Sequence, residues 1–199
     1  MTDNLFPIEH PESERSRGGG FTLWFTGLSG AGKTTIAHLV GPALDERGCV
    51  IEYLDGDVVR THLSKGLGFS KEDRDAHIER VGWVASRLTR HGGAVIVAAI
   101  SPYEATREAA RSMVEPFGRF VEIYVRASVD ECARRDVKGL YAKAFAGEIK
   151  EFTGVSDPYE EPSNPELVID TEAHEPAESA RLILEKLEEL ELIPAEVAA

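Results

Sequence analysis

The chain has 199 residues, of which 42% are hydrophobic, and a formal net charge of -13 at pH 7. This length supports one α/β core and leaves room for only a small second domain. The negative charge argues against a nucleic-acid surface, which normally presents a basic field. No apolar run approaches the roughly 20 residues that cross a bilayer, and the two cysteines lack metal-ligand spacing. We therefore expect a cytoplasmic protein that binds small molecules, with no nucleic acid and no membrane as partner.

Residues 1–20 combine prolines, charges and three glycines without an apolar period, and predict a mobile arm. Residues 21–199 should form a single domain. Its short apolar runs are mostly continuous, as in strands that are buried on both faces of a parallel sheet. Strands are expected at Phe21–Thr26, Val50–Leu54, Ala94–Ala99, Phe120–Val125 and Leu167–Ile169.

Helical patterns alternate with these runs. Helices are expected at Thr34–Arg47, at Ser70–Arg90 with Ser70 and Asp73 as a capping pair, at Tyr103–Glu115, after Ser128 with Glu131 completing a capping box, and at Glu178–Leu190. Strand–helix alternation predicts an α/β fold with a three-layer, doubly wound parallel sheet. In such sheets ligands bind at the carboxyl ends of the strands, so the residues that follow each strand are the candidates for chemistry.

The first such segment fits the phosphate-loop pattern G-x-x-x-x-G-K-[ST] between a predicted strand and a predicted helix. Its residues are Gly27, Leu28, Ser29, Gly30, Ala31, Gly32, Lys33 and Thr34. Backbone N–H groups and a helix N-terminus there suit the β- and γ-phosphates of a nucleotide. Lys33 would meet the terminal phosphates and the Thr34 hydroxyl would bind Mg²⁺. An accidental glycine-rich turn is the alternative, but both flanks of the pattern are correct.

Polar residues also follow the second and third strands. Asp55 and Asp57 flank a glycine, with Arg60 one helical turn later. They could orient a metal-bound water and accept a proton from an attacking hydroxyl, or they could simply cap the next helix. Ser101 either caps a helix or faces the transferring phosphate, and its position alone favours the cap.

Two further segments bring cations and aromatic rings toward the same edge. Residues 65–80 include Phe69, Arg74 and Arg80, which could hold a base and an acidic group, although such residues are often a hydrophobic staple and solvated charges. Residues 134–154 form a basic segment that ends near Phe152. In a phosphoryl-transfer enzyme this segment would act as a lid over the nucleotide.

Together these segments resemble the adenylylsulfate kinase family, which has the P-loop NTPase fold. The resemblance runs from Trp24 to about Asp170. It rests on the ordered motifs GLSGAGKTT, LDGD, GLGFS, EDR, ISPY, RD-x-KGLY, AGEIK, FTG and DPYE, which begin at Gly27, Leu54, Gly66, Glu72, Ile100, Arg135, Ala146, Phe152 and Asp157.

The resemblance implies a kinase that uses ATP and Mg²⁺ to phosphorylate the ribose 3′-hydroxyl of adenosine 5′-phosphosulfate, and that forms a homodimer. The implied catalytic residues are Lys33, Asp55, Asp57 and Ser101, with Thr34 and Asp55 at the metal. Besides the phosphate loop, the implied ATP-binding residues are Thr35, Arg135, Thr171 and His174. The implied acceptor-binding residues are Asp57, Arg60, Phe69, Arg74, His77, Ile100, Ser101, Lys138, Leu140 and Phe152, with the two phenylalanines stacked on the adenine.

The chain also departs from the family pattern. His77 replaces the usual Asn, Glu151 the usual Gly, Val58 the usual Asn and Glu104 a frequent Arg. A histidine at position 77 could gain a charge below pH 6.5 and favour the anionic acceptor, unless it points into solvent. Which aspartate acts as base stays open, and direct transfer needs no phosphorylated Ser101.

Two other functions are considered. Another small-molecule kinase, acting on a nucleotide or a sugar acid, would share the phosphate loop but has no reason to carry GLGFS, FTG and DPYE together. A GTP-binding switch would need a guanine motif NKxD, and the sequence contains none.

Overall fold

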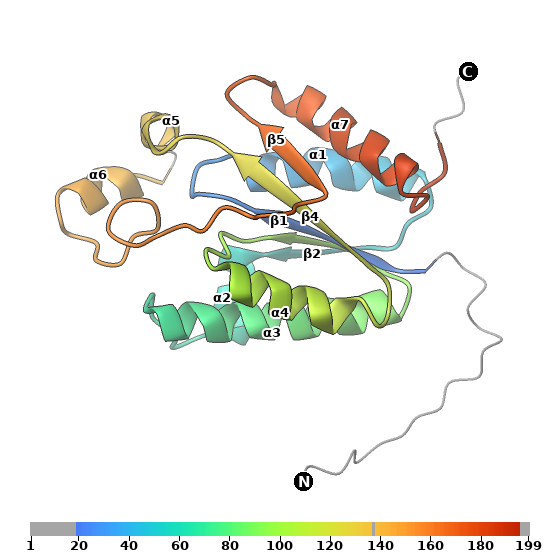
Figure 1. The fold of residues 1–199 in the computed structure, drawn as a ribbon, viewed down its shortest axis with the longest axis horizontal. Helices are drawn as coiled ribbons and strands as arrows, with labels where there is room; N and C mark the ends of the chain where they lie inside the picture. Colours follow the sequence, from blue (N-terminus) through green and yellow to red (C-terminus); the bar gives the residue numbers. More distant parts are fainter. Residues whose placement is uncertain (1–18, 137, 196–199) are drawn as a thin grey trace, which may run out of the picture.

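A five-stranded parallel sheet organises the chain (Figure 1). The structure is a computed structural model that describes residues 19–136 and 138–195. The strands are β1 (Phe21–Thr26), β2 (Ile51–Asp55), β3 (Ala94–Ala98), β4 (Arg119–Arg126) and β5 (Leu167–Asp170), in the spatial order β2-β3-β1-β4-β5. All neighbouring pairs are parallel. The predicted doubly wound sheet is confirmed, and each strand boundary lies within one residue of its expected position.

Helices cover both faces of the sheet, as Figure 1 shows. One face carries α1 (Lys33–Glu46) and α7 (Pro176–Glu189), which pack on each other, and the opposite face carries α3 (Lys71–Arg90) and α4 (Glu104–Val114). The shorter α2 (Gly56–Leu63) follows β2 directly. Beyond the carboxyl ends of the strands lie α5 (Val129–Arg135) and α6 (Leu140–Phe145).

The alternation of side chains along β1 builds a core on each face. Leu23 and Phe25 belong to the cluster under α1 and α7, whereas Trp24 belongs to the cluster under α3 and α4. The expected burial on both faces is confirmed for the three central strands. It is wrong for β2 and β5, which expose Tyr53 and Val168, because these strands form the two edges of the sheet.

The helix starts explain how the predicted caps behave. The Ser70 hydroxyl accepts a hydrogen bond from the Asp73 N–H at 3.2 Å, and the Ser128 hydroxyl accepts one from the Glu131 N–H at the same distance. The capping box at Ser128 is only half formed. The Ser128 N–H donates instead to Glu172 at 2.7 Å, because Glu131 is paired with arginines of its own helix.

The predicted mobile arm lies almost wholly outside the described residues, which begin at Gly19. Gly20 was expected in that arm but is buried. A Cβ atom on it would lie 2.1 Å from the Thr89 carbonyl oxygen, so only glycine fits there. The ordered fold therefore starts before Phe21. Helix α6 was not expected from the sequence either.

Candidate active site

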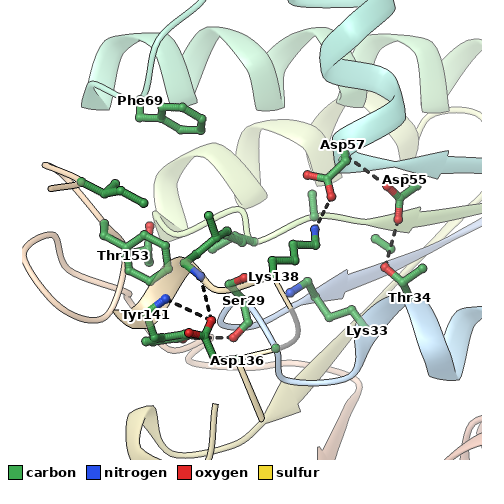
Figure 2. A pocket seen from close by; sticks show the side chains of 18 of the residues that line it. Ser29, Lys33, Thr34, Asp55, Asp57, Phe69, Asp136, Lys138, Tyr141 and Thr153 are labelled. Carbon is green, nitrogen blue, oxygen red and sulfur yellow. Dashed lines mark hydrogen bonds and ion pairs between the residues drawn. The ribbon is translucent and has the colours of Figure 1, made fainter. Parts of the chain in front are cut away.

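The carboxyl ends of β1, β2 and β3 open into a cavity of about 560 Å³. The phosphate loop forms one wall through Ser29, Gly30, Gly32, Lys33, Thr34 and Thr35. The facing wall comes from α3 and from the basic segment, with Phe69, Arg74, Lys138, Leu140 and Phe152 among its residues. Thus the structure brings together most of the site residues that the sequence singles out, and Figure 2 shows how ten of the lining residues lie.

Glycine shapes the phosphate loop at two points. Gly27 has φ 146°, and a Cβ atom there would lie 2.3 Å from the Val125 carbonyl oxygen. Gly32 has φ 104° and precedes the first turn of α1. Both are backbone conformations that glycine adopts without steric cost. Leu28 and Ala31 are buried in the core and hold the loop from below.

Lys33 is buried beneath this loop. Its ammonium group donates to the carbonyl oxygens of Gly27 at 2.8 Å and Leu28 at 2.7 Å. Burial lowers the pKa of Lys33 to about 8, with a smaller contribution from the nearby charge of Lys138. A buried ammonium held only by neutral carbonyls gains strongly from an anion, so the arrangement favours binding of a phosphate group.

Thr34 and Asp55 meet across the gap between α1 and β2. The Thr34 hydroxyl donates to Asp55 Oδ2 at 2.9 Å, while Asp55 Oδ1 accepts the Asp57 N–H at 3.0 Å and caps α2. Asp55 is therefore both a helix cap, through Oδ1, and a residue of the site, through Oδ2. Hydroxyl and carboxylate oxygens suit Mg²⁺, which is usually held by one or two protein ligands plus substrate phosphates. Among the described residues no cluster of three acidic, histidine or cysteine side chains could hold a metal by itself.

Asp57 and Lys138 form an ion pair across the cavity mouth, visible in Figure 2. Asp57 lies in the first turn of α2 and Lys138 lies in the basic segment, so this contact links that segment to the start of α2. Both side chains are exposed. The pair is therefore weak and open to exchange with a ligand.

Phe69 and Arg74 mark the far end of the cavity. Phe69 is 56% exposed, and the guanidinium groups of Arg60 and Arg74 lie 4.8 and 5.7 Å from its ring centroid. Phe152 is largely buried and packs edge-on against Tyr141, with a centroid distance of 4.9 Å. An exposed ring and a fixed ring facing one cavity, with two cations beside them, suit a planar base that carries an anionic group.

His77 is not placed as either sequence hypothesis supposed. It is buried on α3, does not line the cavity, and its Nδ1 lies 2.8 Å from the Ser64 hydroxyl. Burial, together with the charges of Arg60 and Arg80, lowers the pKa of His77 to about 4. The residue is therefore neutral between pH 6 and 8 in the free protein, which gives no support to a charge-dependent acceptor site, and the expectation of a solvent-facing ring is wrong.

Ser101 is placed differently from its neighbour Ile100, which lines the cavity. The Ser101 side chain is buried, and its hydroxyl accepts a hydrogen bond from Trp24 Nε1 at 3.1 Å. The N-cap of α4 is Tyr103, so Ser101 is not the cap either. A buried, bonded hydroxyl outside the cavity gives no support to a covalent role.

Arg135 and Thr171 lie together on the outer side of the phosphate loop. The Arg135 guanidinium donates to Thr171 Oγ1 at 3.0 Å and to the Thr171 carbonyl at 2.8 Å, and it also reaches the Gly30 carbonyl at 3.3 Å. His174 is exposed in the turn that follows β5. None of the three lines the main cavity. Arg135 and Thr171 contact the phosphate loop through the carbonyl oxygens of Gly30 and Ala31.

Several residues of the basic segment line the cavity although the sequence analysis did not predict them as site residues, among them Asp136 and Tyr141. Asp136 accepts the N–H groups of Leu140, Tyr141 and Ala142, at 2.8 to 3.1 Å, and so organises α6. These bonds to the backbone, that of Tyr141 first, lower the pKa of Asp136. The Tyr141 hydroxyl donates to the Ser29 carbonyl at 3.0 Å. An Asp shortly before Gly139 was the available signal, since aspartate often caps a helix.

Comparisons with known proteins point to one family. The family model for adenylylsulphate kinase matches residues 19–170. An adenylyl-sulfate kinase of Picosynechococcus sp. is 58% identical over 171 residues, covering 86% of this chain and 95% of that protein. The solved APS kinase CysC of Mycobacterium tuberculosis, in complex with AMPPNP and APS, has a TM-score of 0.82 and 42% identity, covering 86% of this chain and 99% of that one. The hexameric APS kinase from Thiobacillus denitrificans has a TM-score of 0.69 and 40% identity, over 90% of this chain and 31% of that one.

Proposed function

This chain belongs to the adenylylsulphate kinase family and is an ATP-dependent kinase of adenylyl sulfate, and we propose how its residues carry out the transfer. The γ-phosphoryl group of ATP passes to the ribose 3′-hydroxyl of adenosine 5′-phosphosulfate, giving ADP and 3′-phosphoadenosine 5′-phosphosulfate. One observation supports this assignment of roles above others. A single cavity has the phosphate loop on one wall and an aromatic and cationic wall opposite, with Asp55 and Asp57 on its floor.

On the donor side, ATP phosphates bind along the phosphate loop, where Lys33 leaves its carbonyl partners for the β- and γ-phosphates. The ATP base lies toward Arg135, Thr171 and His174. Thr34 and Asp55 would hold Mg²⁺, and the bound ion would offset negative charge on the phosphates. The 2.9 Å contact of Thr34 with Asp55 supports this pairing because both oxygens reach one point beside the loop.

On the acceptor side, Phe69 and Phe152 stack on the adenine of adenosine 5′-phosphosulfate, and Arg60 and Arg74 attract its phosphosulfate. Asp57 orients the 3′-hydroxyl and accepts its proton. Lys138 then turns from Asp57 to the phosphates, so that binding replaces a weak ion pair with contacts to a polyanion. In-line transfer depends mainly on positioning and charge compensation, and the buried Ser101 takes no part in it.

Labelled ATP tests the proposed reaction. When the protein is incubated with γ-labelled ATP, Mg²⁺ and adenosine 5′-phosphosulfate, the label should appear in a nucleotide from which a 3′-specific nucleotidase releases it. Chelation of Mg²⁺ should prevent the transfer. Label that stays in ATP, or that a 3′-specific nucleotidase cannot release, would contradict the assignment.

The cellular setting is also a proposal. Among the described residues, no helix is long and apolar enough to cross a membrane. We propose that the protein works in the cytoplasm and that it forms a homodimer, the state that the resemblance implies. Light scattering during size-exclusion chromatography gives the mass directly, and a monomer of 21.8 kDa or a hexamer would contradict the dimer.

A further inference from the structure

We propose that Asp157 is a positioning residue for the acceptor site. Its carboxylate holds Arg74 where that guanidinium joins the segment carrying Phe69 to the segment carrying Phe152. The inference rests on the proposed function, because those two rings are assigned there to the acceptor adenine. It adds a residue that touches neither substrate and yet sets the geometry of the binding site.

Arg74 ties two distant parts of the chain together. Its Nε donates to the Phe69 carbonyl at 2.7 Å, and its Nη2 donates to the carbonyl of Glu151, which directly precedes Phe152. The side chain is only 8% exposed. Because a guanidinium is planar and presents its N–H groups in a fixed fork, this double contact fixes how far apart the two ring-bearing segments lie.

The Asp157 side chain contacts Arg74, and the Asp157 backbone contacts the segment that carries Phe152. Its Oδ2 lies 3.8 Å from Arg74 Nε and accepts a hydrogen bond from the Tyr103 hydroxyl at 2.8 Å. Its N–H donates to the Phe152 carbonyl at 3.1 Å, and its carbonyl accepts the Gly154 N–H at 2.8 Å. The turn that carries Phe152 and the carboxylate that faces Arg74 therefore belong to one rigid unit.

Tyr103 fixes the direction of that carboxylate. The ring is buried after Pro102, and burial together with the bond to Asp157 raises the pKa of Tyr103 to about 12. The hydroxyl thus stays protonated and remains a donor at any physiological pH. Sequence motifs that lie far apart, ISPY, EDR, FTG and DPYE, converge at this point.

The charge balance explains why Arg74 needs an acidic partner. Burial lowers the pKa of Arg60, and the neighbouring positive charge of Arg74 lowers it further, so the two guanidinium groups repel each other. The other partners of Arg74 named above are neutral carbonyls. The negative charge of Asp157 offsets this repulsion in the protein without acceptor. If that charge is removed, we expect Arg74 to lose its hydrogen bond to one of the two segments.

Steady-state kinetics of the full chain with each substrate varied in turn tests the inference. Asp157→Asn keeps the shape but removes the charge, Tyr103→Phe removes only the orienting hydroxyl, and Glu148→Gln removes an exposed charge from the same part of the chain. We expect Asp157→Asn to raise the acceptor KM about tenfold and Tyr103→Phe about threefold, with the KM for ATP within about twofold of the wild type. The double variant should raise the acceptor KM by less than the product of the two effects, since both act through one carboxylate.

Each other result has a definite meaning. If Asp157→Asn changes the acceptor KM no more than Glu148→Gln does, the inference is wrong. It is also wrong if the KM values for both substrates rise together with a fall in melting temperature, because that pattern indicates a merely structural role. Should Asp157→Asn fail to fold, the Tyr103→Phe result decides alone by the same criteria. A wild-type protein that does not phosphorylate adenosine 5′-phosphosulfate would instead overturn the proposed function itself.

Discussion

At the scale of single residues, the site depends on charges that the fold keeps out of water. Lys33 is the clearest case. Its ammonium is buried, and its hydrogen-bond partners among the described residues are two carbonyl oxygens, so the protein bears a desolvation cost that a phosphate would offset. The low pKa that results makes the role of Lys33 testable through protons as well as through rates.

ATP binding should take up a proton above the pKa of Lys33, which is about 8. At pH 8.5 Lys33 is mostly neutral in the free protein, and a bound triphosphate would raise its pKa and recharge it, with uptake of roughly three quarters of a proton. Calorimetry in buffers of different ionisation enthalpy measures this number. Lys33→Arg stays charged at that pH and serves as the control. Equal uptake by both proteins, or none by the wild type, would contradict the role of Lys33.

His77 should affect stability rather than acceptor binding. Its pKa of about 4 in the folded protein lies below the unfolded value near 6.5, so the unfolded chain binds more protons between these pH values. This contribution to the free energy of unfolding is complete above pH 6.5 and is lost as the pH falls. At pH 4 the loss is about 3 kcal/mol. Denaturant unfolding at pH 7 and pH 4 should show a smaller loss for His77→Asn than for the wild type. The exposed control His62→Asn should behave as wild type, and three parallel losses would refute the explanation.

At the scale of elements, the backbone of the basic segment is strained at one residue. Glu151 has φ 54°, a left-handed conformation that suits glycine, the residue that the family pattern has there. Its carbonyl must still meet Arg74. The left-handed conformation at position 151 thus accompanies the placement of this carbonyl against Arg74.

Glu151→Gly should stabilise the protein by about 1 kcal/mol, because it relieves the contact between Cβ and the backbone. For a domain of this size the melting temperature should rise by roughly 2–4 °C. Glu148→Gly, at a nearby residue without a positive φ, should lower the melting temperature instead. A fall of similar size in both variants would show that Glu151 is not strained.

Sequence patterns predicted the elements that depend on local residues. The strands, the phosphate loop and the caps at Ser70 and Ser128 follow from short-range rules, and the structure has them within a residue or two. Helix α6 was missed because a single side chain, Asp136, organises its first turn.

Sequence patterns could not predict the features of the site that depend on packing between distant segments. The buried state of His77 comes from its contact with Ser64, and that of Ser101 from its bond to Trp24. The acceptor wall joins Phe69 to Phe152 through contacts between distant segments, so only the family resemblance pointed to it. The roles assigned to these residues remain predictions.

At the scale of the whole molecule, the proposed function requires a chain with a net charge of -13 to bind two anionic nucleotides. The overall field opposes them, so affinity must come from the cations gathered at the site, namely Lys33, Arg60, Arg74 and Lys138. ATP and the acceptor both carry adenine and phosphate. Selectivity between acceptors therefore depends on the wall opposite the phosphate loop, which carries Phe69, Arg74 and Phe152. The central claim is thus a claim about discrimination between acceptors.

The most direct measurement is ADP release from MgATP with adenosine 5′-phosphosulfate, AMP, adenosine or gluconate as the acceptor. We predict that kcat/KM for adenosine 5′-phosphosulfate exceeds that for every other acceptor by at least about tenfold, a difference of roughly 1.4 kcal/mol in transition-state stabilisation. The predicted order follows from the guanidinium groups beside Phe69, which favour the additional anionic group of the phosphosulfate. Equal activity with AMP, or higher activity with gluconate, would contradict the account.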